Sequence, residues 1–491
     1  MTSRPLIILV AALAHGLVAA AQEPRHAALT PGNPARMAAR QDSSHSEIHV
    51  GLTSRSHMSE LAQEGARWRG WEAAGHTFLR LGNGRVAWGR AAYDDGRRTD
   101  VQLSETADYA EIGPMAAADT AGGDKEREAY DFLAGFAWRG RRAGAGLQVE
   151  YSSATEFRTT DPRPKADATV ARVTAGGWLT VVEGHSVGLF CSLRKYSQEV
   201  DIDFYNEYGA SSTIYHLQGL GTDYTRFAGS NDEAYYKGRA ISGGLTYDGP
   251  VSAEVGIGRN HLEKEMPDLD NAVIDETTRR CLWAQASCPM ASERWRHRLA
   301  IAASWTRNEL TQTIFDDGTH TYRPIARRKP YEATAQEATL TFHSSNAHAA
   351  HLELTARAIW SHTEERNTDA RRTLEKTTLA ADILATAWSQ ATLRLRLSYG
   401  LGATHRAALA TRCDLGAPTP KEMPRALAIE RAAFERQTTA RTGGEANLRA
   451  DIGGWGHIHT IFLRAAATAL WYGGRAFAPA WGVTLTAGVT I

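Results

Sequence analysis

The sequence has no recurring apolar runs of about 20 residues, which excludes a helical membrane protein. Its four cysteines in 491 residues are too few for a disulfide scaffold. Lys plus Arg and Asp plus Glu both total 55, so the net charge is zero and no preference for nucleic acid follows. The 43% hydrophobic content excludes wholesale disorder. Composition therefore leaves soluble globular proteins and the outer-membrane β-barrel, whose lumen and loops are polar.

The first 21 residues have the three parts of a secretory signal peptide. Arg4 supplies the positive charge, residues 6–14 the apolar segment, and residues 19–21 the small-residue cleavage site. We predict cleavage after Ala21 and export to the outer membrane of a Gram-negative bacterium. The apolar stretch is too short to favour a membrane anchor, the alternative. Residues 22–45 are predicted to be a flexible periplasmic leader.

The strongest pattern is an alternation of apolar and polar residues, repeated in many segments of about ten residues. From Trp481 to Ile491 every second residue is apolar, and the residues between are Gly or Thr. This length suits a tilted strand that crosses an outer membrane. A soluble sandwich also alternates, but it has no reason to place aromatic rings repeatedly at strand ends, as found at Trp138, Tyr151, Tyr247, Trp305, Trp360, Trp388, Tyr399 and Trp471. We predict an all-β fold, a transmembrane antiparallel β-barrel over residues 46–491.

Turn lengths give the strand number. Short turns are expected near 82–84, 140–142, 183–185, 248–250, 344–347, 389–390 and 453–456. Long loops are expected near 94–127, 157–168, 203–235, 264–293, 317–331, 365–374, 406–432 and 472–480. If the last strand runs toward the periplasm, every short turn is periplasmic and every long loop external. The order closes only if residues near 46–55 supply a first strand that runs away from the periplasm. About 18 strands follow, with residues 306–316 counted as a separate strand, or 16 if the first strand or the one at 306–316 is misread.

Several segments resemble an uncharacterised family of outer-membrane barrels from the Bacteroidota, a domain of unknown function. They are FLRLGNGRVAWGRAAY (78–93), AADTAGGD (117–124), EYSSATEFRTTDPRPK (150–165), IYHLQGLGTDY (214–224) and YYKGRAISGGLTYDG (235–249). The resemblance is strongest over residues 78–249 and supports fold and location. It implies no catalytic residues. Proteins of this family tend to occur beside uptake receptors and surface lipoproteins, so the resemblance implies a role in transport.

Two short motifs have simpler interpretations than catalysis or metal binding. Residues 184–188 match G-x-S-x-G, but strands are expected on both sides, so a hairpin turn is favoured over a hydrolase elbow. Cys281 and Cys288 are expected in an external loop, where a disulfide is an even choice. No His spacing accompanies them, so no metal site is expected. No cofactor motif and no nucleophile–base pair is found, and we expect neither a cofactor nor an enzyme.

Charged residues in the inward register are the candidates for function. Arginines predominate there, at Arg172, Arg194, Arg294, Arg296, Arg298, Arg357, Arg394, Arg396 and Arg464, over the acids Glu150, Glu254, Glu353 and Asp382. An open lumen with this excess would favour anions. Internal pairing with loop carboxylates is the slightly favoured alternative, because the chain is neutral and its loops are acid-rich. Four loop residues are candidates for architecture or ligand contact: Asp119, Asp124, Asp161 and Arg163.

Two functions remain. The first is a porin-like channel or uptake component for a small solute. The second is a plugged barrel that acts as a binding or assembly scaffold for a surface lipoprotein or receptor. Outer-membrane lipid and the barrel-assembly machinery, which would read the C-terminal strand ending at Ile491, are expected partners in both cases; nucleic acid is not.

Overall fold

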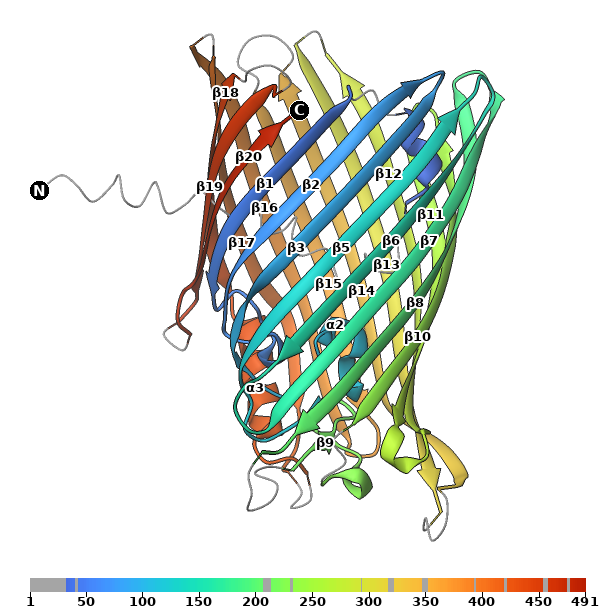
Figure 1. Ribbon diagram of the computed structural model, residues 1–491, viewed down its shortest axis with the longest axis vertical. Helices are drawn as coiled ribbons and strands as arrows, with labels where there is room; N and C mark the ends of the chain where they lie inside the picture. Colours follow the sequence, from blue (N-terminus) through green and yellow to red (C-terminus); the bar gives the residue numbers. More distant parts are fainter. Residues whose placement is uncertain are drawn as a thin grey trace, which may run out of the picture.

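The computed structural model describes residues 32–39, 43–205, 213–229, 233–292, 294–316, 322–346, 352–392, 394–418, 422–453, 458–474 and 477–491. Eighteen antiparallel strands form a closed barrel in which each strand pairs with its neighbours in chain order and β1 pairs with β20 (Figure 1). The strands are β1 (His45–Ser56), β2 (Arg67–Gly82), β3 (Arg85–Val101), β5 (Gly123–Arg139), β6 (Ala143–Phe157), β7 (Arg163–Val182), β8 (His185–Asp203), β10 (Ala234–Asp248), β11 (Ser252–Met266), β12 (Ala272–Ala291), β13 (Trp295–Phe315), β14 (Pro324–Asn346), β15 (Glu353–Asn367), β16 (Arg372–Thr392), β17 (Leu395–Asp414), β18 (Arg441–Gly453), β19 (Thr460–Tyr472) and β20 (Ala480–Thr490). The predicted fold class is confirmed. The predicted signal peptide lies outside the described residues.

The remaining elements are short. They are the 3₁₀ helices η2 (Pro34–Ala39), η3 (Ala62–Glu64), η4 (Gly113–Met115), η5 (Thr225–Phe227) and η6 (Pro267–Leu269), the helices α2 (Tyr109–Ile112) and α3 (Ala426–Thr438), and the strands β4 (Ala117–Ala118) and β9 (Tyr215–His216). β4 and β9 pair with each other and form a separate two-stranded sheet. No helix in the described part of the chain is long and apolar enough to cross a membrane.

Connections at the two ends of the barrel differ in length, as predicted. The end that carries the C-terminus, which we call the periplasmic end, has tight turns such as Asn83-Gly84 between β2 and β3. Asn83 and Gly84 both have positive φ, the geometry of a two-residue hairpin that matches strand twist. The opposite, external end carries the long connections, residues 102–122, 204–233 and 415–440.

One predicted loop is wrong. Residues 264–293 do not form a single external loop, because residues 272–291 are the strand β12, with a short external connection before it and a periplasmic turn after it. Residues 306–316, expected as a separate strand, are mostly the external half of β13. One strand was missed and another counted twice, so the total of 18 is nevertheless correct.

The polarity of the barrel wall inverts along β8. In the part of β8 nearer the periplasm, Leu189 and Leu193 point outward and are 63% and 58% exposed, while Ser192 points inward. Nearer the external end, Glu199 and Asp201 point outward, and Val200 and Ile202 are completely buried inside. The first part has the outer surface of a membrane-spanning strand, whereas the second has the outer surface of a soluble protein.

The external half of the barrel is filled by its own loops. The connections between β3 and β5, β8 and β10, and β17 and β18 place α2, β9 and α3 near the external end, the lower end in Figure 1. They pack on the inner wall around Ile112, Met115, Ile214 and Phe227, all buried. Full burial of such a side chain contributes about 1.5–3 kcal/mol. We call these inward-folded connections the plug.

Candidate functional site

The plug is held to the wall by buried charges centred on Arg158. Its guanidinium donates to Asp119, to Glu105 Oε1 at 3.2 Å, and to the carbonyl oxygens of Pro162 and Gly122 at 2.7 Å each. Lys125 Nζ lies 2.9 Å from Glu105 Oε2. Because the side chains of all four charged residues are at most 2% exposed, each charge needs its partners to remain ionised.

A second group of buried polar contacts fixes α2 and η4. Glu111 Oε1 accepts hydrogen bonds from Arg194 Nη1 and Asn260 Nδ2, both at 2.7 Å. The carbonyl oxygen of Met115 accepts from Lys264 Nζ at 2.8 Å and from the Tyr236 hydroxyl at 3.0 Å. These donors come from β8, β10 and β11, so the plug and the wall share one hydrogen-bond network.

The four predicted loop residues have structural contacts. Asp119 is buried and accepts hydrogen bonds from Arg158 and from the backbone N–H groups of residues 121 and 122. Asp124 pairs with Arg97 at 3.0 Å. Asp161 accepts from the backbone N–H of residue 205 at 3.1 Å, and Arg163 lies over the ring of Tyr205. These contacts are all within the chain and are consistent with a role in loop architecture. Sequence reasoning missed Arg158, whose partners Glu105 and Asp119 lie 53 and 39 residues away in the chain.

Four of the nine predicted lumen arginines form ion pairs within the described part of the chain. Arg172 pairs with Glu150 at 3.0 Å, Arg194 with Glu111 at 2.7 Å, Arg357 with Asp382 at 2.6 Å, and Arg396 with Asp451 at 3.7 Å. Glu254 accepts from the Trp283 indole at 3.1 Å. These contacts correspond to internal charge pairing, the alternative to an anion-selective excess.

The remaining lumen candidates lie closer to the periplasmic end or further around the wall. Arg294 and Arg394 are exposed in periplasmic turns, and Arg296 and Arg298 follow on β13 in the inward register. Glu353 begins β15, and Arg464 lies on β19 next to the buried, inward Phe462. The structure does not bring these residues together into one site.

The expected placement of Cys281 and Cys288 in an external loop is wrong, and the disulfide left open between them does not form. Both residues lie on β12, seven positions apart, and both thiols are free. Seven residues of strand span about 23 Å, far beyond the reach of a disulfide. Cys281 is buried on the lumen side against Phe190 and Trp283, and Cys288 lies nearer the periplasmic end.

Residues 34–39, expected within a flexible leader, are folded into the lumen near its periplasmic end. Asn33 Nδ2 donates to the carbonyl oxygens of Gly177 and Leu189 at 3.1 and 3.3 Å, and Arg36 pairs with Asp248 at 2.6 Å. A Cβ on Gly146 would lie only 2.6 Å from the backbone of Pro34, so glycine is required for this approach. Residues 34–39 are therefore held in place by contacts with β6, β7, β8 and β10.

A cavity of about 260 Å³ lies between the plug and the inner wall of β12 to β16. Its apolar lining is Leu61, Leu220, Ala333, Ala335, Leu374 and Phe434; its principal polar lining is Gln63, Arg279, Tyr331, Glu365, Lys376 and Glu430. The Tyr331 hydroxyl donates to Glu365 Oε2 at 2.8 Å, and Gln63 Nε2 approaches Glu430 Oε1 at 3.4 Å. Burial, together with the neighbouring Glu365 carboxylate, raises the pKa of Glu430 to about 7.

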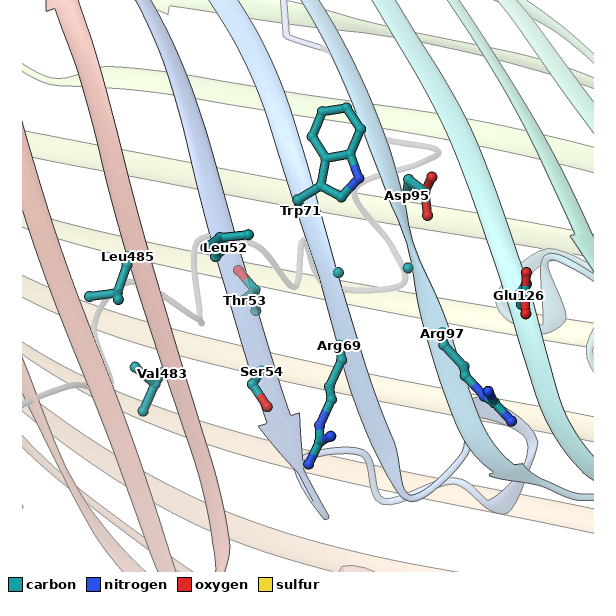
Figure 2. A pocket seen from close by; sticks show the side chains of 12 residues that line it. Leu52, Thr53, Ser54, Arg69, Trp71, Asp95, Arg97, Glu126, Val483 and Leu485 are labelled. Carbon is teal, nitrogen blue, oxygen red and sulfur yellow. The ribbon is translucent and has the colours of Figure 1, made fainter.

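A larger groove, about 630 Å³, lies on the outer wall across β20, β1, β2, β3 and β5 (Figure 2). Leu52, Val483 and Leu485 line one part of it, and Arg69 and Arg97 extend toward the external rim. All five side chains are exposed, with Leu52 at 60%. The groove thus marks the boundary between the apolar band and the charged outer surface, not an entrance to the lumen.

Comparison with known proteins places the chain in a family. The profile of a family of unknown function, DUF6850, matches residues 34–490. The chain belongs to this family. No curated protein matches it.

Solved structures similar to this DUF6850 member are outer-membrane receptors. The ferric-catecholate import receptor Fiu from E. coli K12 has a TM-score of 0.40 and 9% identity, with 92% of this chain and 82% of that chain covered. The ferric yersiniabactin uptake receptor FyuA from Yersinia pestis has a TM-score of 0.42 and 9% identity, covering 92% and 81%. BauA, the ferric preacinetobactin receptor from Acinetobacter baumannii, has a TM-score of 0.40 and 9% identity, covering 91% and 80%.

Proposed function

We propose that this DUF6850 member is a closed outer-membrane barrel that serves as a binding or assembly scaffold for a surface lipoprotein or receptor. Export through the N-terminal signal, assembly through the C-terminal strand, an origin in the Bacteroidota and the absence of covalent chemistry belong to the same proposal. An 18-strand barrel without internal filling is wide enough for a water-filled channel. The observation that carries the proposal is the apolar core around Ile112 and Met115, which occupies the external half of that lumen.

Charge pairing supports the same function. In an ion channel, unpaired charges at a constriction select the permeating ion. Here the guanidinium groups of Arg158 and Arg194 form ion pairs with carboxylates of the plug. The outer surface beyond the apolar band, with Glu199 and Asp201 among its outward residues, is left as the surface available to a partner.

Planar-bilayer recording of the refolded mature chain tests the proposal. We expect no steady conductance from the intact protein. A variant in which residues 105–119 are replaced by a short Gly-Ser linker should conduct, which shows that the preparation inserts. Steady anion-selective conductance from the intact protein, reduced by Arg394→Gln and Arg396→Gln, would overturn the proposal in favour of the open channel.

An uptake component is the second candidate, favoured by the cavity beside the plug. A solute would then pass only when the plug moves. Uptake of a labelled solute by cells, lost when the plug is crosslinked to the wall, would distinguish this function from a scaffold.

A further inference from the structure

Four cations on consecutive strands of the wall lie directly beyond its lipid-facing band. The strands are β8, β10, β11 and β12, each paired with the next (Figure 1). On their outer faces, the large aliphatic residues nearest the external end are between 49% and 63% exposed: Leu193, Ile241, Ile257 and Leu282. Two positions further toward the external end, the outward residue of each strand is an exposed cation: Lys195, Arg239, Arg259 and Arg280. We call these four cations the cationic belt.

The strand register brings the like charges of the belt close together. Lys195 is directly opposite Arg239. Arg259 is directly opposite Arg280. Arg239 and Arg259 are diagonal neighbours, because Arg239 is opposite His261, two positions beyond Arg259 on β11. Directly opposite side chains have Cβ atoms about 4.5–5.5 Å apart, and like charges at this spacing destabilise a sheet. The arrangement therefore favours an external anion that shares these charges.

The belt has no carboxylate partner in the part of the chain that the structure describes. None of its four cations forms an ion pair there. By contrast, Arg307, the next outward cation on β13 and directly opposite Arg280, pairs with Glu309 and Glu332 at 2.9 Å each. Glu309 also exerts its field on Arg280 but forms no ion pair with it. The belt thus ends at β13, where the protein supplies its own acids.

The belt occupies one level of the outer surface, and not every strand carries a cation at that level. On β15 and β16, the outward residues beyond the lipid-facing Trp360 and Leu379 are His362 and Thr377. On β8 the first outward acid is Glu199, four positions beyond the belt and about 13 Å along the strand. The belt therefore lies between the apolar band and the acidic outer surface.

This level is where the headgroups of the external lipid layer meet the protein. The apolar band of a membrane barrel faces acyl chains, so the headgroups lie where that band ends. Guanidinium groups bind phosphate oxygens through paired, charge-assisted hydrogen bonds. The belt covers three strand spacings, about 14 Å in total. One phosphate can bridge cations on two neighbouring strands, so the belt matches a headgroup with two phosphates.

We propose that the cationic belt binds an outer-leaflet lipid whose headgroup carries two phosphate groups, with the acyl chains of the lipid on the four aliphatic side chains next to the belt. This site goes beyond the scaffold function and does not depend on it. Conductance reports on the lumen, whereas lipid binding is measured on the outer wall, so either proposal can fail without the other.

Native mass spectrometry of the full mature chain in detergent micelles measures lipid binding directly. The probe is diphosphoryl lipid A. Monophosphoryl lipid A, which lacks one phosphate, and phosphatidylethanolamine, which has no net charge, are the matched probes. We expect the diphosphoryl lipid to bind at least about fivefold more tightly than the monophosphoryl lipid, and phosphatidylethanolamine to bind more weakly than both. Equal affinities for the three lipids would overturn the proposal.

Inorganic pyrophosphate separates a lipid site from a site for free phosphate. It carries two phosphates without acyl chains, and we expect it not to displace diphosphoryl lipid A at equal concentration. Displacement at equal concentration would show that the belt holds free anions, and the assignment to a lipid would be wrong.

Two double variants localise the binding. Arg259→Gln with Arg280→Gln should lower the affinity for diphosphoryl lipid A about thirtyfold, because each cation beside an anionic lipid surface contributes roughly a fivefold gain. Arg366→Gln with Arg412→Gln should leave the affinity unchanged, because each of these exposed arginines already pairs with an acid on its own strand. Wild-type binding by the belt variant, or equal losses in both, would mean that the belt faces a protein partner or water and not a lipid.

A charge-preserving variant and the salt dependence provide a second measurement. Arg259→Lys with Arg280→Lys keeps both charges and should retain most of the affinity. Because dissolved ions screen exposed charges, the affinity of the wild type should fall when ammonium acetate is raised from about 0.05 to about 0.5 M, and should fall less in the Gln variant. A Lys variant that binds no better than the Gln variant, or a wild-type affinity that is independent of salt, would contradict the role of the belt.

Discussion

The two halves of β8 use the same strand alternation with opposite polarity. On β8 the outward residues change from Leu189 and Leu193 to Glu199 and Asp201, and the inward residues change from Ser192 to Val200 and Ile202. The backbone does not change; the surroundings do. Lipid outside and a polar lumen inside favour one pattern, and water outside with a folded plug inside favours the other. The alternation thus reports a strand, and its polarity reports what lies on each side.

We call the part of the barrel nearer the periplasmic end, whose outer surface is apolar, the membrane half. The largest expected effect comes from placing a polar inward residue, as found in the membrane half, in the external half. Ile202→Asp places a carboxylate in the apolar core beneath the plug, and we expect the free energy of plug opening to fall by about 4 kcal/mol. The outward neighbour Asp201→Asn should change it by less than about 0.5 kcal/mol. Hydrogen exchange of the amides of α2 and β9 measures this opening. Similar exchange in the two variants would show that the core does not hold the plug.

A smaller effect on stability is expected when an arginine of the plug and an arginine of the membrane half are each replaced by methionine. Arg158→Met leaves Asp119 buried without its cationic partner and Glu105 with Lys125 alone, and should destabilise the plug by about 3 kcal/mol. Arg357→Met removes a lumen pair whose arginine side chain is 36% exposed, and should cost less than about 1 kcal/mol. Hydrogen exchange over residues 102–122 and thermal unfolding give the two values. Equal losses would mean that the lumen of the membrane half is as dry as the plug.

The inversion also explains what could be predicted from sequence. Where strands face lipid, apolar residues mark every second position, and residues 481–491 were predicted as a strand for this reason. The external half of β12 has Glu276, Thr278 and Arg280 on its outward face, which carries no lipid-facing signal, so this strand was taken for a loop. The predicted number of strands is nevertheless correct, because β13, which is also polar in its external half, was predicted as two strands.

The candidate sites were less predictable for a different reason. Inward arginines are evident from register, but their partners are distant in sequence: Glu111 is 83 residues from Arg194. The cavity at Glu430 depends on α3 folding into the lumen, which its own sequence does not specify. Likewise, residues 34–39 are ordered by glycines on β6 to β8 and not by any pattern of their own.

The smallest expected effect concerns this N-terminal segment, which packs on the inner wall near the periplasmic end, whereas the plug packs near the external end. Gly146→Val introduces a side chain where the backbone of Pro34 lies, so the segment should be displaced at a cost of about 1–3 kcal/mol while the barrel remains intact. Trypsin cleavage after Arg36, which is protected by its pairing with Asp248, should then become faster. Gly75→Val is the matched control, because a Cβ there meets Ile48 at an ordinary 3.6 Å. If both variants are cleaved at the wild-type rate, the segment is not held by close contact with β6, and the interior of the membrane half is looser than that of the external half.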